Sequence, residues 1–127
     1  MGLDITVDVV SPTPPYEQIR SQIATYVQSG VLPDGARLPT MRALAADLGV
    51  ATGTVARAYA ELEAAGLVAS RRRTGTVVTG GAAAPAPGEQ RVRALAAELA
   101  RTAQEDGVDR DTVLAVVRAA LLTAAPR

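Results

Sequence analysis

The sequence predicts a mainly α-helical protein with one small β-hairpin and, after it, two further helices. Three observations lead to this fold class. Apolar residues recur at helical spacing in five stretches, and two short strand-like runs flank an arginine-rich turn that contains a glycine. Only 2% of the 127 residues are aromatic although 48% are hydrophobic. A core built from Leu, Val, Ile and Ala suits closely packed helices.

The first segment is expected to be a short, half-buried strand. Leu3, Ile5, Val7 and Val9 alternate with polar residues, a period of two that is typical of strands. The proline-rich residues 11–15 end it. From Tyr16 the period changes, and Ile19, Ile23 and Val27 line one face of a predicted helix that ends at Ser29-Gly30.

Two more helices and a hairpin follow. Thr40 is placed to cap a helix with Met41, Leu44, Ala45 and Leu48 on one face, which Gly49 ends. Either Thr52 or Ala51 caps the next helix, which carries Val55, Ala58, Tyr59 and Leu62 and ends at Gly66. Residues 67–69 and 76–79 are expected to pair as strands across a turn of residues 70–75.

A linker composition then separates a C-terminal part. Residues 80–88 read GGAAAPAPG, which is typical of a linker. Beyond it, apolar stripes predict a helix around Val92–Leu99, broken near Gly107, and a second helix that Asp109 caps. We therefore expect one domain over residues 1–79, a linker over 80–88, and a two-helix region over 89–127.

The spacing around Gly49 predicts a helix-turn-helix. Small Ala45 lies where two helices would approach, Gly49 tolerates a positive φ in the turn, and Val55 anchors the second helix. With a helix upstream and a basic hairpin downstream, the order of elements is that of a winged helix-turn-helix. This points to double-stranded DNA as the partner.

Outward-facing residues at the start of the third helix are the candidate base contacts. With Val55, Tyr59 and Leu62 inward, Arg57 is the one long donor on the outer face, suited to a bidentate contact with guanine. The other candidates are smaller side chains, the start of the preceding helix and the hairpin tip: Thr40, Arg42, Ala51, Thr52, Gly53, Thr54, Arg71, Arg72, Arg73 and Gly75.

Local charge agrees with this interface although the whole chain is neutral. Residues 37–80 hold six arginines against three acidic residues, a surplus of three positive charges. The surplus is small, so tight binding is expected only from two joined copies. Arg57 could instead form a salt bridge with Glu61, one helical turn away, and three consecutive arginines are often only a solvated loop. The three tyrosines are expected to be core residues.

The composition also excludes most enzyme classes. The chain has no His, no Cys and no Lys, which removes an imidazole base, a thiolate, the usual zinc ligands and a Schiff-base lysine. We expect no enzyme activity, no cofactor and no metal. The N-terminal residues lack a signal-peptide pattern, and the most apolar stretch, Thr112–Ala125, is too short to span a membrane. The expected location is the cytoplasm.

Several segments closely resemble the N-terminal domain of GntR-family bacterial transcription regulators. They are PYEQI at 15–19, GVLPDGARLPTMRALA at 30–45, TVARAYAELE at 54–63, GLV at 66–68 and GTVV at 75–78. The initial strand and the two-helix C-terminal part are similar to the YtrA subfamily. The resemblance implies a homodimeric repressor of a palindromic operator, with DNA contacts at Arg42, residues 51–54, Arg57 and Gly75. Ala51 and Gly53 depart from the polar residues common in the family, so the operator preference of relatives cannot be copied.

Two other functions compete with this interpretation. Some members of the family carry an aminotransferase-like domain that binds pyridoxal phosphate, but no lysine here could hold that cofactor. A winged helix can also dock on a protein instead of DNA. The two C-terminal helices are expected to form a homodimer rather than an effector pocket, because so few residues cannot enclose a typical ligand cavity. The sequence leaves open whether a small-molecule effector exists, whether the helices swap between subunits, and which operator and genes are involved.

Overall fold

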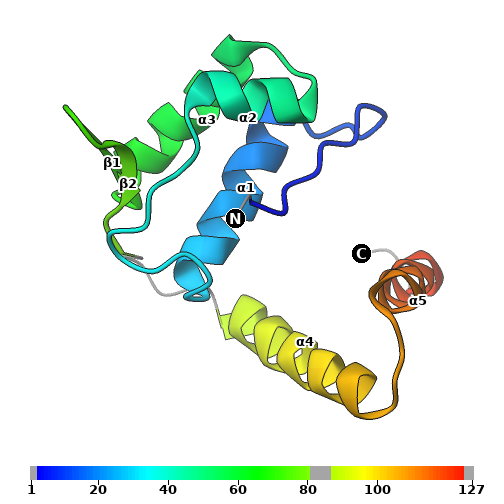
Figure 1. Ribbon diagram of the computed structural model, residues 1–127. Helices are drawn as coiled ribbons and strands as arrows, with labels where there is room; N and C mark the ends of the chain where they lie inside the picture. Colours follow the sequence, from blue (N-terminus) through cyan, green and yellow to red (C-terminus); the bar gives the residue numbers. More distant parts are fainter. Residues whose placement is uncertain (1–2, 81–86, 125–127) are drawn as a thin grey trace. The chain divides into compact units, whose positions relative to one another are not determined.

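The computed structural model describes residues 3–80 and 87–124, and the chain forms two compact units, Met1–Ala84 and Pro85–Arg127. The first unit contains α1 (Pro15–Gln28), α2 (Met41–Leu48), α3 (Thr52–Ala64), β1 (Val68–Arg71) and β2 (Gly75–Val78) (Figure 1). Three helices followed by an antiparallel hairpin make the predicted winged helix-turn-helix. The second unit contains α4 (Pro87–Glu105) and α5 (Arg110–Thr123).

The turn between α2 and α3 follows from local chemistry. The Thr40 hydroxyl accepts a hydrogen bond from the Ala43 N–H at 3.1 Å, which caps α2 as predicted. Gly49 ends the helix at φ +69°, a conformation that a side chain disfavours. Ala45 is buried beneath this turn. The short connection therefore holds α2 and α3 against each other, as the helix-turn-helix pattern requires.

A buried tyrosine connects the same two helices. Tyr59 of α3 is only 2% exposed, and its hydroxyl donates a 2.7 Å hydrogen bond to the Pro39 carbonyl, just before α2. Burial raises the pKa of Tyr59 well above that of a free tyrosine, so the hydroxyl keeps its proton. The start of α2 is thereby held to the middle of α3.

The core of the first unit lies where α1, α3 and the hairpin meet. Val55, Ala58 and Leu62 of α3 are fully buried, as are Ile19 and Ile23 of α1. These are the side chains that the helical spacing placed on the inner faces. The core prediction is thus confirmed for both helices.

The hairpin is longer, and its turn tighter, than the sequence suggested. Val68 pairs with Val78 and Arg71 with Gly75, so the turn contains only residues 72–74. The prediction of a turn over residues 70–75 was wrong because Ser70 and Arg71 belong to β1 and Gly75 to β2. Cross-strand pairing outweighs the weak strand preference of these polar residues.

The outer edge of β2 is covered by the segment before α2. Arg37 forms an isolated bridge with Val77, and the Leu38 N–H donates to the Thr76 carbonyl at 2.9 Å. The Val78 N–H donates to the Ala36 carbonyl at 2.8 Å. The hairpin is therefore paired on one side with a third extended segment that no sequence pattern indicated.

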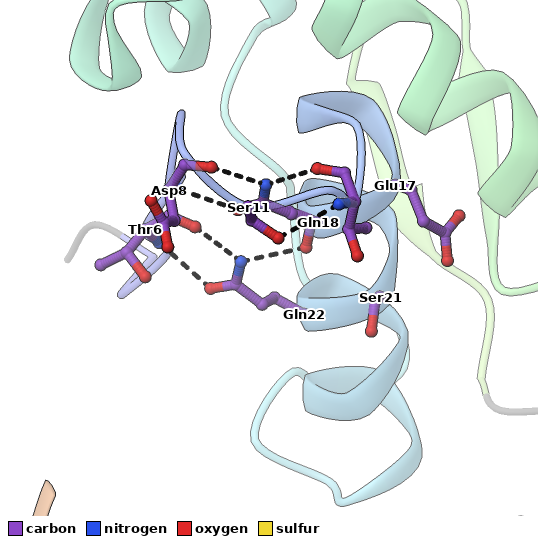
Figure 2. Close-up of a pocket in the computed structure, with 8 residues that line it drawn as sticks. Thr6, Asp8, Ser11, Glu17, Gln18, Ser21 and Gln22 are labelled. Carbon is purple, nitrogen blue, oxygen red and sulfur yellow. Dashed lines mark hydrogen bonds between the residues drawn. The ribbon is translucent and has the colours of Figure 1, made fainter. Parts of the chain in front are cut away.

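The predicted N-terminal strand was wrong in its pairing, and its alternation holds only for residues 3–7, because Val9 is 86% exposed. Ile5 is buried and its neighbours Asp4 and Thr6 are exposed, yet residues 3–8 belong to no sheet. Two glutamine side chains of α1 replace a partner strand (Figure 2). Gln22 exchanges hydrogen bonds of 3.1 and 2.7 Å with the backbone of Thr6, and Gln18 does so with Asp8 at 2.8 and 2.9 Å.

The second unit consists of two largely exposed helices. The predicted linker over 80–88 overlaps it, because Pro87 and Gly88 already belong to α4, while residues 81–86 lie outside the described part of the chain. Gly107 breaks the helices as expected, at φ +69°. Asp109 is the N-cap residue of α5, but its carboxylate accepts from the Thr112 hydroxyl rather than from a backbone N–H. Hydrogen bonding to that hydroxyl lowers the pKa of Asp109.

Candidate nucleic-acid interface

The N-terminal turn of α3 presents a surface of small side chains. Ala51, Thr52 and Gly53 are exposed and Thr54 is half-buried. Ala51 is the N-cap residue, and no side chain caps this helix. The Thr54 N–H bonds to the Ala51 carbonyl at 3.0 Å, whereas the N–H groups of Thr52 and Gly53 bond to no acceptor in the described residues. This end of α3 can approach another molecule closely and offers it two backbone donors.

The start of α2 adds a second exposed set of polar groups. Thr40 and Arg42 are both exposed. The Thr40 hydroxyl oxygen is engaged as a cap, so its proton remains available for an acceptor outside the protein. Arg42 lies in the first turn of α2, where the helix dipole also favours an anion.

The hairpin carries the third set. Arg71, Arg72, Arg73 and Gly75 are all exposed, and Gly75 adopts φ +88° directly after the turn. The Arg37 side chain stabilises this turn, since its Nε donates a 2.7 Å hydrogen bond to the Thr74 carbonyl. The arginines at the tip are therefore presented from a braced turn.

A groove of about 500 Å³ joins the hairpin to the start of α2. Thr40 and Met41 line one wall, and Arg73 and Gly75 line the other together with Arg37. The structure thus brings two of the predicted sets, the start of α2 and the hairpin tip, to one concave surface. Arg57 does not line this groove.

Arg57 is held at a separate position, beside α1. Its guanidinium lies over the Tyr16 ring at 3.7 Å from the centroid, and its Nε lies 3.5 Å from Oε2 of Glu61. The salt bridge with Glu61, which the sequence offered as an alternative to a DNA contact, is thus present. The Arg57 side chain is nevertheless 62% exposed, so the ion pair is well hydrated and weak.

A second ion pair joins two residues of α1. Arg20 of α1 pairs with Glu17 at 2.5 Å, and the hydrogen bond between them lowers the pKa of Glu17 and raises that of Arg20. Glu61 also acts electrostatically on Arg20.

Two functional contributions were missing from the sequence interpretation. Arg37 was counted only for its charge, but it supports the hairpin turn. All three tyrosines were expected in the core: Tyr59 is buried there, whereas Tyr16 and Tyr26 are half-buried at its edge. No sequence signal links Tyr16 to Arg57, because the contact joins two helices distant in the chain.

Comparison with known proteins shows which family this chain resembles. Residues 15–78 match the model of bacterial regulatory proteins of the gntR family. The HTH-type transcriptional regulator Rv1152 of Mycobacterium tuberculosis is 51% identical over 75 residues, which are 59% of this chain and 62% of that protein. The chain thus matches less than two thirds of the length of this relative.

Solved structures give the same relationship. YtrA from Sulfolobus acidocaldarius, a GntR-family transcription factor, is 37% identical and superposes with a TM-score of 0.56 over 72% of this chain and 97% of that one. The DNA-binding domain of AraR, solved in complex with its operator ORE1, is 25% identical with a TM-score of 0.51, over 61% of this chain and 94% of that one. The relatives named here are transcriptional regulators, and this chain belongs to the GntR family of bacterial regulatory proteins.

Proposed function

We propose that this protein binds double-stranded DNA in a sequence-specific way, as a homodimeric repressor of a palindromic operator. The exposed N-terminal turn of α3 carries this proposal. Small Gly53 and exposed Ala51 let the helix enter a major groove deeply, and the flanking N–H groups can bind phosphate. The operator complex of the AraR domain supports the same use of a related fold.

The proposed roles of the side chains follow from their positions. Arg57, Thr52, Gly53 and Thr54 would face the bases, with Ala51 at the entry of the helix. Thr40 and Arg42 would hold a phosphate at the start of α2. Arg71, Arg72, Arg73 and Gly75 would bring the hairpin to the backbone or the minor groove.

Binding to DNA is tested best with a charge-matched pair of variants. Fluorescence anisotropy at about 0.15 M salt would compare a duplex from the region upstream of the gene with a random duplex of equal length. Arg57→Ala combined with Arg72→Ala should weaken binding strongly. The slope of the logarithm of the binding constant against the logarithm of the salt concentration should also become shallower, by about one unit for each lost phosphate contact. Arg101→Ala with Arg118→Ala removes the same charge from the second unit and should bind as the wild type does.

The outcome that would overturn DNA recognition is equally clear. If the wild-type protein binds the upstream duplex no better than the random duplex, the upstream region contains no operator for it. If the Arg57 and Arg72 variant also retains its binding, the winged helix serves another partner, such as a protein.

The second unit supports the proposal of a homodimer. Its helices leave many large apolar side chains exposed, among them Leu95 at 60% and Leu121 at 72%. An exposed apolar stripe of this kind is normally covered by another surface. The hollows along α4 and α5 are about 270 and 190 Å³, below the ~300–1,000 Å³ typical of ligand pockets, which favours a second copy of the chain over an effector.

A dimer would also explain how a modest positive charge is sufficient for tight binding. Two joined copies contact two half-sites about one helical turn of DNA apart, ~34 Å. Light scattering of Leu95→Glu with Leu121→Glu should report a monomer, with a large loss of operator affinity. As a control, Gln90→Glu introduces a glutamate at another position of α4, and this variant should still form a dimer. A wild-type protein that is monomeric at all concentrations would refute the proposal.

Repression would follow from occupancy alone. A protein bound across a promoter excludes polymerase from it, and such a regulator would act in the cytoplasm, where the chromosome lies. A reporter gene behind the upstream region should be expressed more strongly when the protein is deleted. Lower expression after deletion would identify an activator instead.

A further inference from the structure

The Tyr16 ring lies directly under the arginine that the proposed function assigns to DNA. The guanidinium of Arg57 is 3.7 Å from the ring centroid, within the distance of a cation–π contact. Tyr16 lies in the first turn of α1, and its ring packs against the edge of the core, so its position is fixed by the fold. A flexible arginine is therefore held by a rigid platform on another helix.

The contacts of the guanidinium leave one part of it available. Tyr16 covers a face of the planar group, and Glu61 lies 3.5 Å from Nε. The edge formed by the two Nη atoms makes no hydrogen bond within the described residues. This edge is the one that can donate two parallel hydrogen bonds to a phosphate or to guanine.

The two contacts differ in how they respond to DNA. A phosphate competes directly with the Glu61 carboxylate for the positive charge, and the Glu61 side chain is 42% exposed, so water can solvate that carboxylate once the ion pair is exchanged. The Tyr16 ring is uncharged and binds the face of the guanidinium, so an acceptor at the edge does not displace it. The ion pair can be exchanged while the stacking is kept.

We propose that Tyr16 is a positioning residue for DNA recognition: it orders the Arg57 side chain before binding and keeps it stacked in the complex. This inference rests on the proposed DNA-binding function. Ordering an arginine in advance removes a cost that a free side chain would incur on binding. Loss of the ring should therefore weaken operator binding by about two- to tenfold.

A double-mutant cycle separates this role from ordinary packing. Tyr16→Leu should weaken binding to the upstream duplex, whereas Tyr16→Phe, which keeps the ring, should bind as the wild type does. In an Arg57→Ala background, Tyr16→Leu should cause no further loss. An equal loss in both backgrounds would assign Tyr16 a purely structural role and overturn the proposal.

Nuclear magnetic resonance of the wild-type protein gives a second measurement that requires no change at Tyr16. The Arg57 side-chain resonances should be displaced by the ring current of Tyr16 and should stay displaced when the upstream duplex is added. Their return to ordinary positions on binding would refute retained stacking. If the wild type fails to distinguish the upstream duplex from a random one, the DNA-binding function fails; specific binding without coupling to Arg57 contradicts this inference alone.

Discussion

The hydroxyl of Tyr59 offers the most direct test of how the helix-turn-helix is held together. Tyr59→Phe removes only the oxygen that donates to the Pro39 carbonyl at 2.7 Å, and leaves the ring in the core. Because the side chain is 2% exposed, water cannot readily replace the lost donor. A hydrogen bond of this kind contributes about 0.5–1.5 kcal/mol, and an acceptor left without a partner costs ~1–3 kcal/mol. We expect the free energy of unfolding to fall by about 1–2 kcal/mol.

Urea denaturation followed by circular dichroism measures this change. The midpoint should shift to lower urea concentration while the slope of the transition stays the same, since the surface exposed on unfolding is unchanged. For a unit of this size the melting temperature should fall by roughly 4–8 °C per kcal/mol. Operator affinity should fall as well, because the start of α2 is no longer tied to α3.

Tyr26→Phe is the matched control. It removes a hydroxyl from α1 whose contact with the Asp4 carbonyl is exposed to solvent. Such surface changes usually alter stability by less than ~0.5 kcal/mol. If the two variants unfold at the same urea concentration, the Tyr59 hydrogen bond does not stabilise the fold, and the reasoning from burial is refuted.

Three further predictions concern pH, the turn and the hairpin. In the unfolded chain Tyr59 ionises with its ordinary pKa of about 10, whereas burial raises the pKa of Tyr59 in the folded state. The free energy of unfolding should therefore fall as the pH rises above ~10. In urea titrations at these pH values, Tyr59→Phe should show a smaller fall than the wild type. Gly49→Ala should destabilise by about 1–2 kcal/mol because Gly49 has φ +69°, while Gly53→Ala, at an ordinary φ, should not; equal midpoints would contradict this. Arg37→Gln should loosen the turn at residues 72–74 and speed amide hydrogen exchange there, whereas unchanged exchange would show that the bond to Thr74 does not brace the hairpin.

The sequence by itself determined the three helices of the first unit and their ends. A cap at Thr40, glycines with positive φ at 30, 49 and 66, and apolar residues at helical spacing act within a few residues of each other. Such short-range interactions can be predicted from the sequence without knowledge of the fold. The same is true of the solvent-facing positions of α3, which follow from which residues its core face uses.

Pairing between distant segments was decided only by the tertiary structure. The alternation of residues 3–8 reports that alternate side chains are buried; it does not say whether a strand or two glutamines will satisfy the backbone. Arg37 under the hairpin, and the stacking of Arg57 on Tyr16, join residues that no local period relates. These contacts depend on how whole elements pack, and packing brings together side chains whose separation along the chain carries no signal.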